Sequence, residues 1–214
     1  MKGLAVRQTG PEHVEGLAEL QKIVFPTLAE EERFTAANYR KHIELFPEGQ
    51  MCVVDTERGD RVVGMTSTIR MDFDFAHPQH TFAEVIQGGW LTSHQPDGRW
   101  LYGADIGAHP DYRGRGIARA LYAARQALVR RLGLEGQVTV GMPSGYGALK
   151  HTMSASAYRD ELVAGTRNDP TISAQLRIGF EIGPLVPGYI NDPVCDGYGI
   201  VLVLPASRDV SSPA

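Results

Sequence analysis

Hydrophobic and polar residues follow two periods along this chain, one typical of helices and one typical of strands. Apolar positions recur at helical spacing over residues 117–132, which predicts an amphipathic helix. An apolar run over residues 101–108 predicts a buried strand, and His109-Pro110-Asp111 ends it. The glycine-rich turn Arg113-Gly114-Arg115-Gly116 joins this strand to the helix.

The remaining pattern predicts an α/β (α+β) protein. Before the central strand and helix we expect a strand (4–8), two helices (11–24 and 34–46) and two strands joined by a turn (51–55 and 61–70). After them we expect a strand (137–142), a helical segment (154–166) and two closing apolar runs (180–186 and 198–204). Because neither an internal repeat nor a Pro/Ser linker divides the chain, we expect one domain over residues 1–206 and a flexible tail over 207–214.

The turn before the central helix has the composition of an anion site. Backbone N–H groups at a helix start lack partners, and the helix dipole places positive potential there. Gly114 and Gly116 have no Cβ to keep a phosphate from the backbone, and Arg113 and Arg115 add positive charge. We therefore expect a pyrophosphate to bind at residues 113–118.

Two common nucleotide motifs do not fit this turn. The dinucleotide fingerprint needs a third glycine, where this chain has Arg119, and its acidic residue should end the next strand, whereas Glu135 precedes it. A P-loop needs Gly-Lys-Ser/Thr, and no such triplet follows. A nicotinamide oxidoreductase and a P-loop enzyme are therefore both disfavoured.

Composition narrows the class of protein further. With 43% hydrophobic and 21% charged residues the chain is typical of globular proteins, and its net charge of −4 disfavours nucleic acid as the main partner. The sequence begins without the apolar core of a signal peptide and has no run of membrane-spanning length, so we expect a cytoplasmic protein without a membrane partner.

Metal-binding patterns are weak in this sequence. Cys52 and Cys195 form neither a metal motif nor a disulfide framework, and we expect both to be buried and reduced. His77, His80 and His94 do not have the spacing of a zinc set, so we interpret them as solvated loop residues.

The strand, the His-Pro-Asp-Tyr lead-in, the turn and the helix together resemble the acyl-coenzyme A loop of the GNAT acyltransferase superfamily. Its pattern Arg/Gln-x-x-Gly-x-Gly/Ala is met by Arg113, Gly116 and Ala118. The resemblance implies a mixed central sheet of about six to seven strands, flanked by helices and splayed at the cofactor strand. It also implies acetyl-CoA as co-substrate and no metal.

Further segments are similar to one GNAT branch, often fused to or encoded beside a carbon–nitrogen (nitrilase-like) hydrolase. These segments are residues 103–106, 109–113, 143–146, 158–161, 169–173, 179–180 and 187–189. The branch implies an association with such a hydrolase, and we also consider a homodimer. It does not identify the acceptor.

The resemblance assigns the cofactor contacts residue by residue. The thioester is expected along Ile106, Gly107 and Ala108, with the Ala108 N–H polarising the carbonyl and Gly107 allowing the pantetheine arm to approach. The pyrophosphate is expected on the N–H groups from Gly114 through Arg115, Gly116 and Ile117 to Ala118, and Asn168 falls on the family's asparagine position.

The proton-transfer groups are less defined. Asp105 on the cofactor strand is either the general base or a hydrogen-bonding partner of nearby backbone, with Glu84 and Glu161 as alternative bases. The tyrosine with which many GNAT enzymes protonate the departing thiolate is replaced by Gln175, which cannot donate a proton usefully. Either Tyr146, Tyr158, Tyr189 or water serves instead, or the enzyme relies on positioning of the reactants alone, and among the tyrosines we prefer Tyr146.

Two functions follow from this combination. The first is an N-acetyltransferase that moves an acetyl group from acetyl-CoA directly to the amine of a small molecule. The second is a non-catalytic acyl-CoA-binding accessory domain of a hydrolase system, which the missing tyrosine and the fused relatives favour.

Overall fold

A mixed sheet of seven strands forms the centre of the computed structural model, which describes residues 1–210. The strands are β1 (Leu4–Gln8), β2 (Met51–Asp55), β3 (Arg61–Met71), β4 (Trp100–Ala108), β5 (Gly136–Gly141), β6 (Glu181–Val186) and β7 (Gly199–Pro205). Their order across the sheet is β1-β2-β3-β4-β5-β7-β6, and only β4 and β5 run parallel. The predicted fold class is confirmed.

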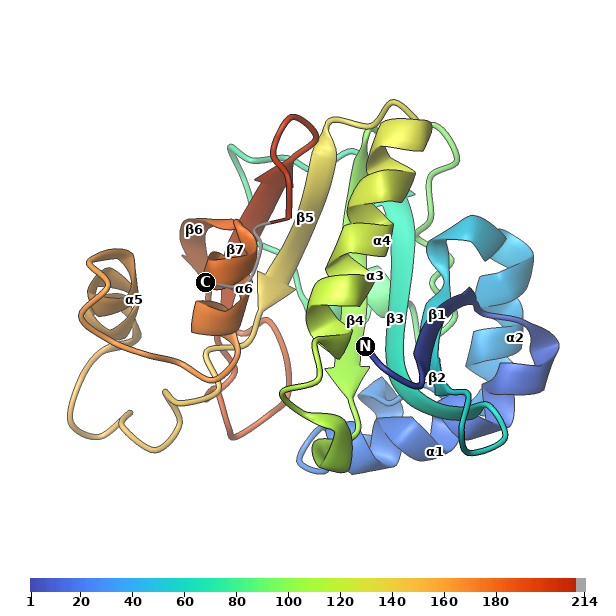
Figure 1. Ribbon diagram of the computed structural model, residues 1–214. Coiled ribbons are helices and arrows are strands. Elements are labelled where there is room, and N and C mark those ends of the chain that lie inside the picture. The colour runs from blue at the N-terminus through green and yellow to red at the C-terminus, as the bar shows by residue number, and fades with distance from the viewer. Residues whose placement is uncertain (211–214) are drawn as a thin grey trace.

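Helices cover both faces of this sheet (Figure 1). The helices are α1 (Val14–Val24), α2 (Ala36–Leu45), α3 (Phe82–Ile86), α4 (Ile117–Arg131), α5 (Ala155–Val163) and α6 (Ile172–Ile178). Residues of α1, α2 and α3 share one apolar cluster on one face, whereas α4 and α6 pack on the opposite face. The pattern does not predict α3 and α6, because each spans too few residues to show a helical period.

The two parallel strands separate part-way along their length. Trp100 to Gly103 of β4 pair with Gly136 to Thr139 of β5, and beyond Gly103 strand β4 has no partner on that side. We call the opening between the remainder of β4 (residues 104–108) and the end of β5 the seam. The splay expected at the cofactor strand is therefore present, and it opens toward the turn that precedes α4.

A β-bulge in β4 lies at the start of the seam. Asp105 pairs with Ser67 of β3 and Gly103 pairs with Thr68, so Ala104 is an extra residue without a partner. The extra residue shifts the alternation of side chains along the strand. Asp105 consequently points to the α1 and α2 face, where it contacts Gln21 and Tyr39.

The end of the described chain lies against α4. Gln126 Nε2 donates to the carbonyl of Arg208 at 2.8 Å, and Arg130 forms an ion pair with Asp209 at 2.6 Å. Residues 207–210 of the predicted flexible tail therefore have partners, and residues 211–214 lie outside the described residues. Within residues 1–210, none of the helices has the length and apolar character needed to cross a bilayer.

Candidate active site

The turn before α4 leaves its glycine backbone open. Gly114 and Gly116 adopt φ of +74° and +82°, a left-handed conformation that favours glycine. Among residues 1–210, no heavy atom lies within 4 Å of a Cβ built on Gly114, and the atom closest to one built on Gly116 is Met1 Cγ at 3.9 Å. We call this turn and the start of α4, residues 113–118, the cradle. Side chains do not fill the space beside its two glycines, as binding of a pyrophosphate requires.

The first turn of α4 supplies unpaired donors beside these glycines. The first helical hydrogen bond runs from Ala120 N to Gly116 O at 3.0 Å. The N–H groups of Ile117 and Ala118 therefore have no acceptor within the helix. The side chain of Ile117 is buried toward β3, whereas Ala118 is exposed and leaves its amide accessible.

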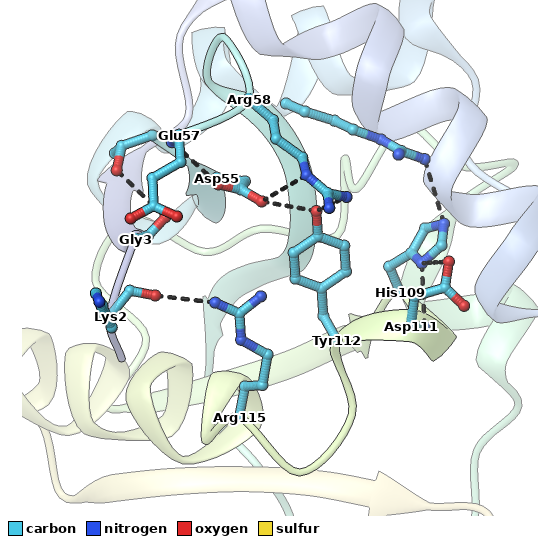
Figure 2. Close-up of polar contacts among 11 residues, drawn as sticks. Lys2, Gly3, Asp55, Glu57, Arg58, His109, Asp111, Tyr112 and Arg115 are labelled. Carbon is cyan, nitrogen blue, oxygen red and sulfur yellow. Dashed lines mark hydrogen bonds and ion pairs between the residues drawn. The ribbon is translucent and has the colours of Figure 1, made fainter.

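Tyr112 anchors the turn to the sheet (Figure 2). Its hydroxyl donates to Asp55 Oδ2 at 2.7 Å, a hydrogen bond that lowers the pKa of the Asp55 carboxyl. Arg115 stacks on its ring, with the guanidinium 5.0 Å from the ring centroid, and donates to the Lys2 carbonyl at 2.9 Å. Arg113 is exposed beside the open backbone. Contacts with the sheet and with the N-terminal segment therefore hold the turn in place.

Strand β4 presents backbone donors to the seam. His109 N donates to the Val63 carbonyl of β3 at 2.9 Å. Because successive N–H groups of a strand point to opposite sides, the N–H of Ala108 is directed away from β3 and into the seam. Ile106 packs against two apolar clusters, one that includes Leu121 of α4 and one that includes Tyr122 of α4. A Cβ on Gly107 would lie 2.5 Å from Cγ1 of Val24 in α1, so here the glycine serves helix packing.

Asp105 is a buried carboxyl with three donors around it. The Ser67 amide donates to Oδ1, and Gln21 Nε2 and the Tyr39 hydroxyl donate to Oδ2 at 2.7 and 3.4 Å. Only 8% of the residue is exposed, and burial raises the pKa of Asp105 to about 6 despite these donors. A carboxyl that titrates near neutral pH suits a general base. A backbone partner is also present, but it is Ser67 of strand β3, whereas a neighbouring loop was expected.

Arg125 of α4 lies on the other face of β4, opposite Asp105. It is 2% exposed and donates to Thr66 Oγ1 and to the backbone carbonyl of Asp105. Its Nε has no partner among the described residues, and burial lowers its pKa. In the sequence, Arg125 is one of several basic residues on this helix that would suit a phosphorylated cofactor, and its burial against β4 is not predicted. Its position on the apolar face of the helix, between Leu121 and Leu128, was the available signal.

Tyr146 and Asn168 lie in the segment between β5 and α6. The Tyr146 hydroxyl donates to the Met153 carbonyl at 3.4 Å, and its buried ring packs between those of Tyr158 and Tyr198. Asn168 is exposed and accepts a hydrogen bond from Arg177 at 3.3 Å. Neither contact brings the side chain to the cradle, and the roles of both residues stay predictions.

The alternative bases have other partners. Glu84 caps α3 by accepting from the Thr81 amide at 2.6 Å, and Glu161 forms an ion pair with Arg167 at 2.6 Å. Asp105 is thus the predicted base whose surroundings raise its pKa into the neutral range.

Gln175 contacts a tyrosine from another helix. Its Nε2 donates to the hydroxyl of Tyr122 in α4 at 2.8 Å, and both side chains are buried. The sequence analysis missed Tyr122, because a tyrosine on the apolar face of a helix is indistinguishable from an ordinary core residue.

The three loop histidines differ from one another. His77 is exposed, as expected. His80 is half-buried, and its Nε2 accepts a hydrogen bond from the Tyr102 hydroxyl at 2.9 Å. His94 stacks on Phe46 with ring centroids 4.9 Å apart. The expectation of full solvation is therefore wrong for His80 and His94. The described residues contain no group of three or more His, Cys, Asp and Glu side chains arranged to hold a metal ion.

Comparison with known proteins agrees with this geometry. The sequence model of the Acetyltransferase (GNAT) family matches residues 14–150, which include the cradle and β4. The chain belongs to this family of acyl-CoA N-acyltransferases. The resemblance predicted from the turn and its flanking elements is thereby confirmed at the level of the superfamily.

Two relatives from Bacillus subtilis (strain 168) differ in length. The chain is 31% identical over 191 residues to a "Probable hydrolase YhcX", covering 89% of this chain but 36% of that protein. It is 29% identical over 202 residues to an "Uncharacterized N-acetyltransferase YkwB", covering 94% of this chain and 88% of that one. The GNAT chain thus spans about a third of the hydrolase and most of the acetyltransferase.

A solved structure shares the whole fold. The GNAT-like decarboxylase GphF, in complex with isobutyryl-CoA, superposes with a TM-score of 0.74 at 21% identity, covering 94% of this chain and 99% of that one. The similarity extends the shared fold beyond residue 150, into α5, α6 and the last two strands.

Proposed function

We propose that this GNAT protein moves an acetyl group from acetyl-CoA to the amine of a small molecule by direct transfer. The observation that carries the proposal is the sequence of three features along β4 and the turn after it. These are the open backbone of Gly114 and Gly116, the edge of β4 that has no partner beyond Gly103, and the buried carboxyl of Asp105. They have the chemistry needed for a diphosphate, a thioester carbonyl and an amine in turn.

The chain's own residues supply the following steps. The N–H groups of residues 114–118 bind the diphosphate, and Arg113 and Arg115 add charge at that end. The Ala108 N–H donates to the thioester carbonyl and stabilises the negative charge that develops on it. Asp105 accepts the proton of the incoming ammonium, directly or through water, so that the neutral amine can attack.

Loop contacts around Asp105 favour a small acceptor over a protein surface. Phe82 N donates to the Tyr189 carbonyl at 2.6 Å, which joins α3 to the loop between β6 and β7. Thr27 donates to Asp192 of the same loop at 3.0 Å, and this contact joins the loop to the segment after α1. These contacts hold α3 and the β6–β7 loop against the segment after α1, on the side of the sheet to which Asp105 points, and this arrangement favours a small acceptor.

The second candidate is an acyl-CoA-binding accessory domain without turnover. Gln175 in place of the family's tyrosine and the similarity to part of a probable hydrolase favour it. The same similarity supports an association with a nitrilase-like hydrolase. A cytoplasmic location and a homodimer are further parts of the proposal.

Turnover with a panel of amines tests the proposal. We expect release of free CoA thiol from acetyl-CoA with at least one primary amine, and loss of that release in Asp105→Asn while acetyl-CoA binding by calorimetry persists. Tight binding with no turnover on any amine would establish the accessory role. Because the structural relative GphF is a decarboxylase, CO2 release from a carboxylated acyl-CoA belongs in the same panel, and turnover of that kind alone would replace the transferase proposal.

A further inference from the structure

Tyr122 of α4 lies at the wall of the seam. Ala118, one helical turn before it, is exposed at the cradle, and the two residues lie on the same side of α4, where Tyr122 is buried. Tyr122 belongs to the same apolar cluster against which Ile106 of β4 packs, and its ring contacts Phe180 beyond α6 at 5.0 Å between centroids. The Tyr122 ring therefore packs in the cluster that connects β4 with α6 and β7.

Gln175 fixes the orientation of this phenol. The glutamine Nε2 donates to the Tyr122 hydroxyl at 2.8 Å, and among residues 1–210 no acceptor is hydrogen-bonded to the hydroxyl proton. Because an O–H both accepts and donates, the contact with Gln175 uses a lone pair and leaves the proton available. Gln175 thus orients the phenol and leaves its proton available for donation.

A second unpartnered atom lies beside it. Gln175 is 5% exposed, and its Oε1 has no hydrogen-bond partner among the described residues. A Cβ on Gly141, at the end of β5, would lie 2.6 Å from this oxygen, so the amide reaches the far wall of the seam. Buried polar groups without partners are rare, and this one is suited to accept from an amide N–H of a bound pantetheine arm.

We propose that Tyr122 is the general acid of the transfer reaction, in place of the tyrosine that Gln175 replaces. The inference rests on the proposed function. As the carbon–sulfur bond of the tetrahedral adduct breaks, the electron pair remains on sulfur and the Tyr122 hydroxyl proton passes to it. The oxyanion re-forms the carbonyl, the amide nitrogen releases its extra proton, and free CoA thiol leaves. A proton equivalent to that one returns through water to the tyrosinate.

The surroundings of Tyr122 suit both of its protonation states. Burial raises the pKa of the phenol, so it carries its proton at neutral pH. The guanidinium of Arg125 lies 5.3 Å from the ring centroid and acts in the opposite direction, stabilising the anion formed during transfer. Tyr146, the acid preferred from the sequence, already donates its proton to the Met153 carbonyl.

Paired phenylalanine variants test the assignment. Tyr122→Phe should lower kcat for acetyl-CoA by about 100-fold, the effect of removing a positioned acid, with the Kd of acetyl-CoA unchanged within about twofold. Tyr146→Phe is the competing variant, and Tyr102→Phe, which removes the hydroxyl of another fully buried tyrosine, is the matched structural control. Both should keep kcat within about threefold of the unmodified protein.

Two further readouts separate an acid from a packing residue. A selenol is a much stronger acid than a thiol and leaves without protonation, so the defect of Tyr122→Phe should largely disappear with acetyl-seleno-CoA. The double variant Tyr122→Phe/Gln175→Tyr returns a phenol to the family's position and should regain at least about tenfold of the lost kcat.

The possible results distinguish failure of the Tyr122 assignment from failure of the proposed function. Equal kcat for Tyr122→Phe and the unmodified protein, a larger loss in Tyr146→Phe, or an undiminished defect with the selenoester each overturns the assignment to Tyr122. Absence of turnover in the unmodified protein refutes the proposed function instead, before any variant is compared.

Discussion

Asp105→Asn should make the protein more stable at high pH while abolishing its activity. The carboxyl is buried beneath α1 and α2, and its pKa rises from 3.8 to about 6 because burial penalises the ionised form. Asparagine has nearly the same shape and never ionises. It still accepts from the Ser67 amide, and the side chain of Gln21 can rotate to accept from its amide group.

The magnitude follows from linkage between proton binding and folding. An acid whose pKa is higher in the folded than in the unfolded state stabilises the fold below the unfolded value, and this contribution is lost as pH rises through the folded value. A rise of about two units corresponds to roughly 3 kcal/mol. About 2 kcal/mol of this falls between pH 4.5 and 7.5, a window that brackets the folded-state pKa of about 6.

The difference between the two proteins must be measured, because another buried group acts in the opposite sense. Burial lowers the pKa of His42 from 6.5 to about 4, so its contribution to stability rises with pH over the same window. Urea unfolding of both proteins at several pH values, compared at each pH, cancels the His42 contribution.

The expected result is a free-energy difference that grows by about 2 kcal/mol in favour of Asp105→Asn from pH 4.5 to pH 7.5. In the unmodified enzyme, kcat/KM should rise with pH through an apparent pKa near 6, as expected for a base that must be ionised. A pH-independent difference in stability would show that Asp105 is not protonated in the folded protein near neutral pH and would refute the reasoning.

The remaining predictions concern the cradle and two buried polar groups. Gly116→Val should weaken acetyl-CoA binding at least tenfold by calorimetry, whereas Gly165→Val, which has a similar φ of +70° in open space, should carry the same backbone strain of about 1–2 kcal/mol without changing affinity. His42→Gln should abolish the loss of roughly 3 kcal/mol expected between pH 6.5 and 4, and equal acid sensitivity of the two proteins by thermal unfolding would contradict this. Asp169→Ala should cost about 3 kcal/mol or more in urea unfolding, because the buried carboxylate accepts from three backbone amides and one hydroxyl, whereas exposed Asn168→Ala should stay within about 0.5 kcal/mol.

Local signals predicted the cradle from the sequence. The apolar run of β4, the His109-Pro110 break and the glycines of the turn each act over a few residues, and the long period of α4 defines the helix behind them. β1 and β2 have the predicted bounds for the same reason. The signals for each of these elements come from residues that are neighbours in the sequence, so the hydrophobic pattern is sufficient to predict the element.

Non-local contacts could not be predicted in the same way. Tyr122 and Gln175 meet because α6 packs beside α4, and neither residue differs in pattern from an ordinary core position. Asn168 was placed by counting back from Gly179-Phe180, but a count does not show which way a side chain faces, and the residue is exposed. The bulge at Ala104 is likewise invisible in an apolar run, because its cause is the pairing with β3.

That bulge connects the groups on which catalysis depends. Because Ala104 is inserted without a partner, the carboxyl of Asp105 points to the α1 and α2 face. The backbone carbonyl of the same residue accepts from Arg125 on the α4 face. Arg125 therefore holds the strand where β5 departs, lowers the pKa of Asp105 through the sheet and lies beside the ring of Tyr122. One buried cation thus acts on both the proposed base and the proposed acid. Replacing it would therefore disturb the protonation of both, and this influence on both groups accompanies a burial that is unfavourable for the guanidinium itself.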